Sequence, residues 1–302
     1  MITYGSSHSS VLRWVTVALV CFLGLQLGTL PAFAQDGLSP EQKQKLQKEL
    51  QQTYKEGAKA GNAKNFEVAI ARFEEAIQLA QKLGMSDITE RIQGNLVESL
   101  KGAGSSALNE ENYETALSRY DKLLEYTDED PSVHYNRGLA LINIEDSTEA
   151  GLQSLQRAIE LGNETGNTRV ANLATERIRD EFVATASEAL QGNNPSQSQV
   201  TTALDALDQM REYVDPSANS LFYRATALFE GGQHQQAIQA AREGLSMHQG
   251  SRSDAAKFHY VVGESQMAVG EKASACQTFQ SAAYGDYEAR ANHYLQNECD
   301  DL

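Results

Sequence analysis

Few residues of this chain have the types and spacing that chemistry requires. The acidic run from Glu125 to Asp130 lacks the alternating oxygen ligands and the glycine of a calcium loop, so a solvated turn is the simpler interpretation. Neither a glycine-rich phosphate loop nor a Gly-x-Ser-x-Gly turn for a nucleophile occurs in the sequence. The histidines after residue 34 are dispersed, with no metal-binding pair at helical spacing: His134, His234, His248, His259 and His293. We therefore expect no catalysis, no cofactor and no metal site.

Cys276 and Cys299 are the residues for which the sequence predicts a covalent bond. They are the only cysteines after residue 34, and an even pair in an oxidising compartment favours one disulfide. Such a bridge would close a loop near the C-terminus and contribute about 3 kcal/mol in the chain-entropy model. Two free thiols are the alternative, because the sequence does not show whether the geometry allows a bond.

The N-terminal residues 1–34 have the pattern of a secretory signal peptide. Arg13 precedes an apolar run from Trp14 to Leu30, and small residues follow. We expect cleavage between Ala34 and Gln35, which predicts an exported protein of the periplasm or the extracellular space. An uncleaved anchor is the alternative, since the apolar run could just span a thin bilayer; after cleavage no segment long enough to insert in a membrane remains.

The chain is strongly acidic. Its formal net charge is −16, and the first 34 residues contribute only Arg13 to it. A surface of this sign repels nucleic acid phosphates and anionic lipid headgroups, so neither is an expected partner. Lysines cluster between Lys43 and Lys64, whereas none occurs from Leu123 to Ala256. The basic first segment could dock on an acidic partner or on another copy of the chain; a solvated end face is the alternative.

Composition and capping signals predict helices along the whole mature chain. Prolines number only 5, and Ser39-Pro40, Asp130-Pro131, Asp215-Pro216 and Asp286 predict helix starts. We expect one continuous domain over residues 35–302. Turn residues divide it into six helical hairpins and a capping helix, expected over residues 40–84, 86–127, 131–163, 167–214, 217–249 and 252–283, with the cap at 286–299.

A pattern of small and aromatic residues recurs along these hairpins. A small residue is followed after twelve, sixteen and nineteen positions by alanine, an aromatic residue and alanine: Gly57, Ala69, Phe73, Ala76 and Gly263, Ala275, Phe279, Ala282. Small residues let two antiparallel helices approach closely, and the aromatic ring is expected to fill the gap between neighbouring hairpins. Together with the segment Tyr135-Asn136-Arg137-Gly138-Leu139-Ala140-Leu141, this pattern resembles the tetratricopeptide repeat over residues 40–283, least so in the fourth unit.

The resemblance implies an all-α solenoid of about six antiparallel hairpins that binds other proteins. The intervals between successive repeats are uneven, and two of them exceed the family's period of about 34 residues. We therefore expect an irregular superhelix around residues 87–107 and 167–192.

In this family the first helices of successive hairpins line a concave groove that receives a peptide or a helix. The residues at the corresponding helical face are Tyr54, Lys101, Tyr135, Leu139, Ile142, Phe222, Phe229, Tyr260, Glu264 and Met267. Tyrosine and phenylalanine concentrate binding energy at interfaces, so we expect an apolar floor with polar tips; packing against neighbouring hairpins is the alternative. The family's capture of C-terminal carboxylates is not expected, because only Lys101 has the right sign and Ser105 stands where asparagine is required.

Two functions follow from this reading. The first is an exported, non-catalytic adaptor or scaffold whose groove binds a peptide or helix of a partner protein, with the acidic field favouring an apolar or basic segment. The second is a structural module of the cell envelope that assembles with itself through its end hairpins, as a homo-oligomer without a groove ligand.

Overall fold

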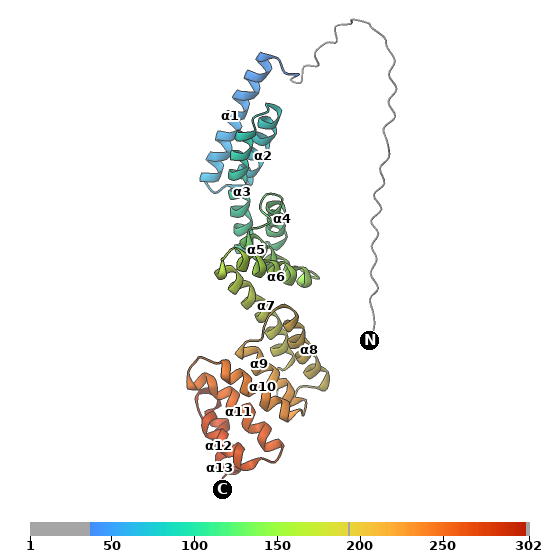
Figure 1. The fold of residues 1–302 in the computed structure, drawn as a ribbon, viewed down its shortest axis with the longest axis vertical. Coiled ribbons are helices and arrows are strands. Elements are labelled where there is room, and N and C mark those ends of the chain that lie inside the picture. Colours follow the sequence, from blue (N-terminus) through green and yellow to red (C-terminus); the bar gives the residue numbers. More distant parts are fainter. Residues whose placement is uncertain (1–36, 193, 300–302) are drawn as a thin grey trace, which may run out of the picture.

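The structure, a computed structural model, describes residues 37–192 and 194–299 of the chain. Within these residues the chain forms α-helices and one short 3-10 helix and no strand, and consecutive helices pair as hairpins (Figure 1). The six pairs are α1 (Pro40–Asn62) with α2 (Phe66–Lys82), α3 (Ser86–Asn109) with α4 (Tyr113–Leu124), α5 (Pro131–Ile142) with α6 (Thr148–Glu164), α7 (Thr168–Ala189) with α8 (Gln197–Tyr213), α9 (Ala218–Glu230) with α10 (His234–Met247), and α11 (Arg252–Ala268) with α12 (Lys272–Ala282). The 3-10 helix η1 (Gly285–Tyr287) and α13 (Glu288–Asn297) complete the described chain.

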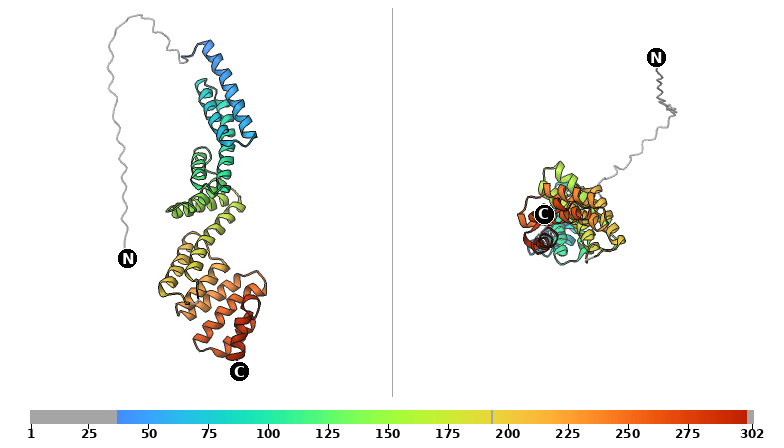
Figure 2. Two further views of the ribbon diagram at one scale, coloured as in Figure 1. Left: turned by 180° about the vertical axis from the view of Figure 1, so that it is seen from behind. Right: turned by 90° about the horizontal axis from the view of Figure 1, so that it is seen from below.

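This architecture confirms the predicted all-α solenoid of six hairpins with a C-terminal capping helix. The stack is elongated, with α1 and α13 at opposite ends in Figure 1, and Figure 2 shows the hairpins overlapping when viewed along the long axis. No helix in the described part of the chain is long and apolar enough to cross a membrane. The predicted signal peptide and its cleavage site at Ala34 and Gln35 lie outside the described residues.

The irregular repeat spacing has its cause in two long first helices. α3 has 24 residues and α7 has 22, whereas α5 and α9 have 12 and 13. The extra turns lie in the two stretches where the sequence predicted an irregular superhelix. Figure 1 shows α7 as the link between an arm that contains α1–α4 and a block that contains α8–α13.

Side-chain caps fix two of the predicted helix starts. The Ser39 side chain accepts a hydrogen bond from the backbone of Gln42, and the Gln42 side chain accepts one in return, which is a complete capping box. The Asp130 carboxylate accepts a hydrogen bond from the backbone N–H of Ser132 at 2.9 Å, so it caps α5. Both observations confirm the sequence prediction.

Two other predicted starts are wrong. Ser217, and not Asp215, caps α9, because it forms a capping box with Ser220 and leaves Pro216 outside the helix. Asp286 lies inside the 3-10 turn, and α13 begins two residues later without a side-chain cap. The 3-10 turn takes the place of the predicted capped start.

Small residues bring the two helices of a hairpin into close contact. A Cβ atom on Gly57 would lie 2.9 Å from the ring of Phe73, and one on Gly263 would lie 2.7 Å from the ring of Phe279. Each ring therefore covers the glycine of its own hairpin, whereas the sequence predicted that it fills the gap between neighbours. Both rings are almost completely buried, so this contact belongs to the core.

The last hairpin is covered by α13, as expected. Tyr294 of α13 stacks on Phe279, with ring centroids 4.4 Å apart, and Ala291 is fully buried. Cys276 of α12 and Cys299 are joined by a disulfide, with their Cα atoms 5.8 Å apart, which confirms the predicted bond. The apolar end of the solenoid is thus closed by a short helix that a covalent bond holds in place.

Candidate partner-binding cleft

The structure places the predicted groove residues on the first helices of their hairpins, but it leaves none of them fully open to solvent. Nine are half-buried, and Tyr260 is only 8% exposed. Among the apolar ones, Tyr135 and Ile142 pack against a core cluster that extends from α6 to α8, Phe229 against a cluster of α9–α11, and Met267 against the C-terminal cluster. Leu139 is half-buried on α5. Packing therefore accounts for part of the surface that the sequence assigned to a groove.

Tyr260 is the most buried of the predicted groove residues. The rings of Tyr287 and Phe279 lie 5.1 and 5.9 Å from its ring, and the guanidinium of Arg290 lies 5.6 Å from it. Burial, together with the nearby Glu264 carboxylate, raises the pKa of the Tyr260 hydroxyl. The segment after α12 thus covers most of this ring, and its remaining exposed part lines a hollow beside Arg290 and Tyr294 of α13. A partner would therefore reach Tyr260 only over the cap, and its assignment to the groove stays a prediction.

Lys101 makes an ion pair that fixes the start of a helix. Its Nζ donates a hydrogen bond to Asp130 at 3.0 Å. Burial raises the pKa of the Asp130 carboxyl, but the hydrogen bonds from Lys101 and Ser132 outweigh it, and the net effect lowers this pKa. Lys101 thus connects α3 to the cap of α5, and its positive charge is paired with Asp130 within the protein.

Phe222 packs against the next hairpin along the chain. Its ring meets the ring of Phe258 edge to face, with centroids 5.8 Å apart. The Nζ atom of Lys257 lies 4.6 Å from the Phe222 centroid, which is a cation–π contact. These contacts hold α9 against α11, and the Phe222 side chain is half-buried.

Glu264 gives the C-terminal end a pH-dependent stability. Burial, foremost, raises the pKa of its carboxyl, although hydrogen bonds from Tyr260 and Tyr294 oppose the shift. An acid with a raised pKa stabilises the folded state most when it is protonated, so this contribution is present at low pH and is lost as the pH rises through the raised value. Since glutamine is neutral and its amide oxygen can accept the hydrogen bond from Tyr294, Glu264→Gln is expected to raise the melting temperature at neutral pH and to remove this pH dependence. Melting curves of both proteins between mildly acidic and neutral pH would show it; a variant less stable than wild type at neutral pH would contradict this account.

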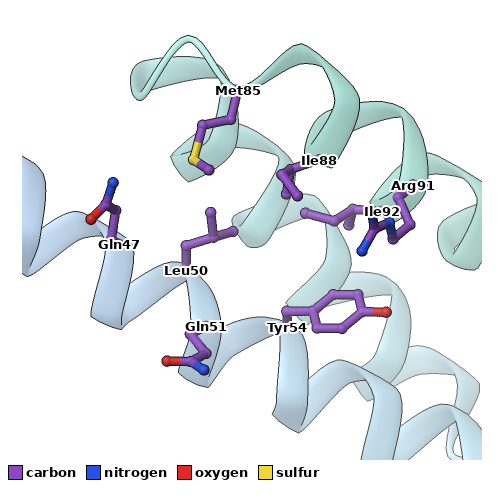
Figure 3. Close-up of a pocket in the computed structure, with 8 residues that line it drawn as sticks. All are labelled: Gln47, Leu50, Gln51, Tyr54, Met85, Ile88, Arg91 and Ile92. Atoms are coloured by element: carbon purple, nitrogen blue, oxygen red, sulfur yellow. The ribbon is translucent and has the colours of Figure 1, made fainter.

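An unfilled cleft opens between α1 and α3, the first helices of the first two hairpins (Figure 3). Its volume is about 440 Å³, and it is lined by Gln47, Leu50, Gln51, Tyr54, Met85, Ile88, Arg91 and Ile92. Figure 3 shows Leu50, Ile88 and Ile92 pointing toward one another across the cleft, with Gln47 and Gln51 along its α1 side. The cleft therefore combines an apolar floor with amide groups that can bond to a peptide backbone.

Tyr54 forms one wall of this cleft and is the predicted groove residue that lines it. Its hydroxyl accepts a hydrogen bond from Nδ2 of Asn95 on α3 at 3.1 Å, and its ring lies 5.9 Å from that of Phe73. These contacts hold the side chain in one position without filling the space beside it. A fixed aromatic wall reduces the entropy lost when a partner binds.

The sequence pattern missed most of the floor. Ile88 and Ile92 lie on one face of α3, and Met85 precedes the first residue of this helix. The prediction had placed only Lys101 on α3. The apolar spacing of three and four residues at the start of α3 is the signal that could have found them. The cleft itself depends on the distance between α1 and α3. That distance cannot be inferred from the spacing of residues within one helix.

A second hollow of about 580 Å³ lies between α6, α7 and α8, and its rim is acidic. Glu149, Glu181 and Glu212 line it, and the hydroxyl of Tyr213 donates to both oxygens of Glu149 at 3.0 Å. No group of three or more histidine, cysteine or acidic side chains in the described residues is placed to hold a metal ion. The α1–α3 cleft is the better candidate for protein binding, because its lining is mainly apolar.

Comparison with known proteins gives one family. A family model described as "Tetratricopeptide repeat" matches residues 102–164, 196–252 and 224–292, which together make up more than half of the chain. The unmatched stretch around α7 agrees with the weak pattern of the fourth unit, and the α1–α3 cleft precedes the first match. No curated protein matches the chain. With hairpins of this geometry and more than half of its length matched, the chain belongs to the tetratricopeptide repeat family.

Proposed function

We propose that this protein is a non-catalytic adaptor that holds a segment of a partner protein by an apolar side chain in the α1–α3 cleft. Tetratricopeptide repeats generally mediate interactions between proteins, so the class of function follows from the family. The observation that carries the finer proposal is the unfilled apolar cleft on the face formed by first helices. Met85 and Ile88 of this cleft are partly exposed to water, whereas Leu50 and Ile92 are already buried. A partner side chain that covers Met85 and Ile88 would remove this apolar surface from water.

The size of the cleft suits one large apolar side chain with its flanking backbone. Burying a leucine-sized or phenylalanine-sized side chain contributes about 1.5–3 kcal/mol, and aromatic anchors in pockets are typical centres of binding energy. Tyr54 supplies a rigid wall, and Gln47 and Gln51 supply hydrogen-bonding groups at the edge. This division of roles matches a site that recognises a short segment, with further contacts along the solenoid.

The test compares two glutamines that are adjacent on α1. Gln51 lines the cleft, whereas Gln52 is exposed on another face and contacts Glu56. Gln51→Trp is expected to fill the cleft and to abolish crosslinked capture of the partner from the compartment in which the protein resides, and Gln52→Trp is expected to leave capture unchanged. If Gln51→Trp retains every partner, the cleft is not the binding site. If the captured species is the protein itself, light scattering would identify self-assembly instead.

We propose further that the protein acts outside the cytoplasm. The support is the charge and apolar pattern of residues 1–34, which ends at a small-residue site before Gln35. Sequencing the N-terminus of the protein from fractionated cells is the test. An exported form that begins at Gln35 is the expected result, and a cytoplasmic form with an intact N-terminus would contradict export.

A further inference from the structure

We propose that the α1–α3 cleft selects an acidic segment, in which the apolar anchor is flanked by the carboxylates of aspartate or glutamate. The inference rests on the proposed function, because it names the chemistry of the segment that the same cleft would hold. It reverses the expectation from net charge, which favoured an apolar or basic segment. The reason lies in how charge is distributed around this end of the solenoid.

The cleft itself contains one charged group, and that group is positive. Arg91 is exposed, and its side chain makes no ion pair with any residue in the described part of the chain. Figure 3 shows it beside Ile92, at the same end of the cleft as the Tyr54 ring. No acidic side chain is among the eight that line the cleft. A partner carboxylate placed here would form a charge-assisted hydrogen bond with the guanidinium, whose planar donors match the two oxygens of a carboxylate.

The helix that forms the other wall is also basic. Lys48 and Lys55 of α1 are exposed beside the face that carries Gln47 and Gln51. α1 carries more lysines than glutamates, and one of its glutamates, Glu56, is paired with Arg72 at 3.2 Å. A segment in the cleft would therefore meet positive charge from both walls.

The acids of α2 are neutralised within the fold. Every acidic residue of α2 is in an ion pair, and these pairs are Glu67 with Arg119, Glu74 with Lys122 and Glu75 with Arg72. Three acids of α3, Asp87, Glu90 and Glu98, are in no ion pair among the described residues, but none of them lines the cleft. Glu98 lines a separate hollow beside Asn62 and Phe66. At physiological ionic strength charges are screened beyond about 8 Å, so the acidic hairpins farther along the solenoid act weakly here. α1 lies at one end of the described solenoid, far from the hairpins that contain α9 to α12 (Figure 1).

A random peptide library displayed on phage tests this chemistry directly. The purified protein is panned against the library beside the Gln51→Trp variant, and peptides that depend on an open cleft are sequenced. The expected sequences contain a large apolar residue with aspartate or glutamate within a few positions of it. Enriched peptides with lysine or arginine at those positions would overturn the proposal.

Charge reversal at one position supplies the control. In Arg91→Glu the selected flanks are expected to change from acidic to basic, and the best acidic peptide is expected to bind at least about tenfold more weakly by fluorescence anisotropy. Arg169 on α7 is also exposed and outside any ion pair among the described residues, so Arg169→Glu changes the net charge equally and should alter neither result. Equal effects of the two reversals would overturn the local recognition by Arg91.

The two proposals fail in different ways. If cleft-dependent peptides are selected but their flanks carry no acidic preference, the adaptor function stands and the acidic partner does not. If no peptide distinguishes the wild-type protein from Gln51→Trp, the cleft is not a peptide site and both proposals are overturned.

Discussion

Removing the disulfide by Cys276→Ser with Cys299→Ser is expected to destabilise α13 against detachment from the solenoid by about 3 kcal/mol. The two cysteines are 23 positions apart, and the loop between them contains the end of α12, the 3-10 turn and the whole of α13. α13 has 10 residues, and Ala291 is its one fully buried side chain among those described. A helix this short is marginal by itself, so its stability comes from packing and from the covalent bond.

The loss should be local, because each hairpin of a solenoid contacts mainly its neighbours. Hydrogen exchange of the α13 amides is the appropriate measurement, and the reduced wild-type protein should behave like the double variant. Detachment would expose the rings of Phe279 and Tyr260, so a dye that binds apolar surfaces should bind more strongly. Exchange in α1 and α2, at the far end of the stack, is the internal control and should not change. Equal protection of α13 in the oxidised and reduced proteins would show that the stacked rings alone hold the helix.

The cap also shows where sequence reasoning succeeded and where it stopped. The sequence predicted a capping helix over residues 286–299, and the structure places η1 and α13 there, with Tyr287, Ala291 and Tyr294 packed on the last hairpin. The same covering buries Tyr260, which the helical face alone had assigned to a groove. A face of one helix can be read from the period of its residues, but what lies over that face depends on another segment.

Lys101 and Tyr54 also show that contacts between residues far apart in the sequence decide whether a predicted groove residue is free to bind a partner. The ion pair between Lys101 and Asp130 joins residues 29 positions apart, so the spacing of residues within α3 could not predict it. Tyr54 also bonds to a residue far along the chain, since Asn95 is 41 positions away. It remains a candidate because the space beside its ring is open. Hairpins and several caps depend on neighbours in sequence and were predictable, whereas the cleft depends on the distance between two hairpins. Partner-binding assignments for the remaining candidates stay predictions.

Gly104→Ala is expected to destabilise the second hairpin relative to an alanine substitution elsewhere on the same helix. A Cβ atom at Gly104 would lie 2.8 Å from Cζ of Tyr120, a distance that real Cβ atoms essentially never show. The ring cannot retreat easily, because Tyr120 is 1% exposed and its hydroxyl shares a hydrogen bond with Ser105 at 3.3 Å. Forcing one extra methyl group into such a core costs about 1–3 kcal/mol.

Gly94 provides the matched control, because it lies on α3 as well and a Cβ atom there would meet nothing within 4 Å. Alanine is a better helix former than glycine by about 1 kcal/mol, so Gly94→Ala should stabilise the protein. That gain is common to both variants, and the difference between their free energies of unfolding in urea isolates the steric cost at Gly104. The difference should vanish when Tyr120→Leu is present in both, since the obstructing ring is then gone. If Gly104→Ala stabilised the protein as much as Gly94→Ala, close approach of α3 and α4 would not be the reason for a glycine at this position of the repeat.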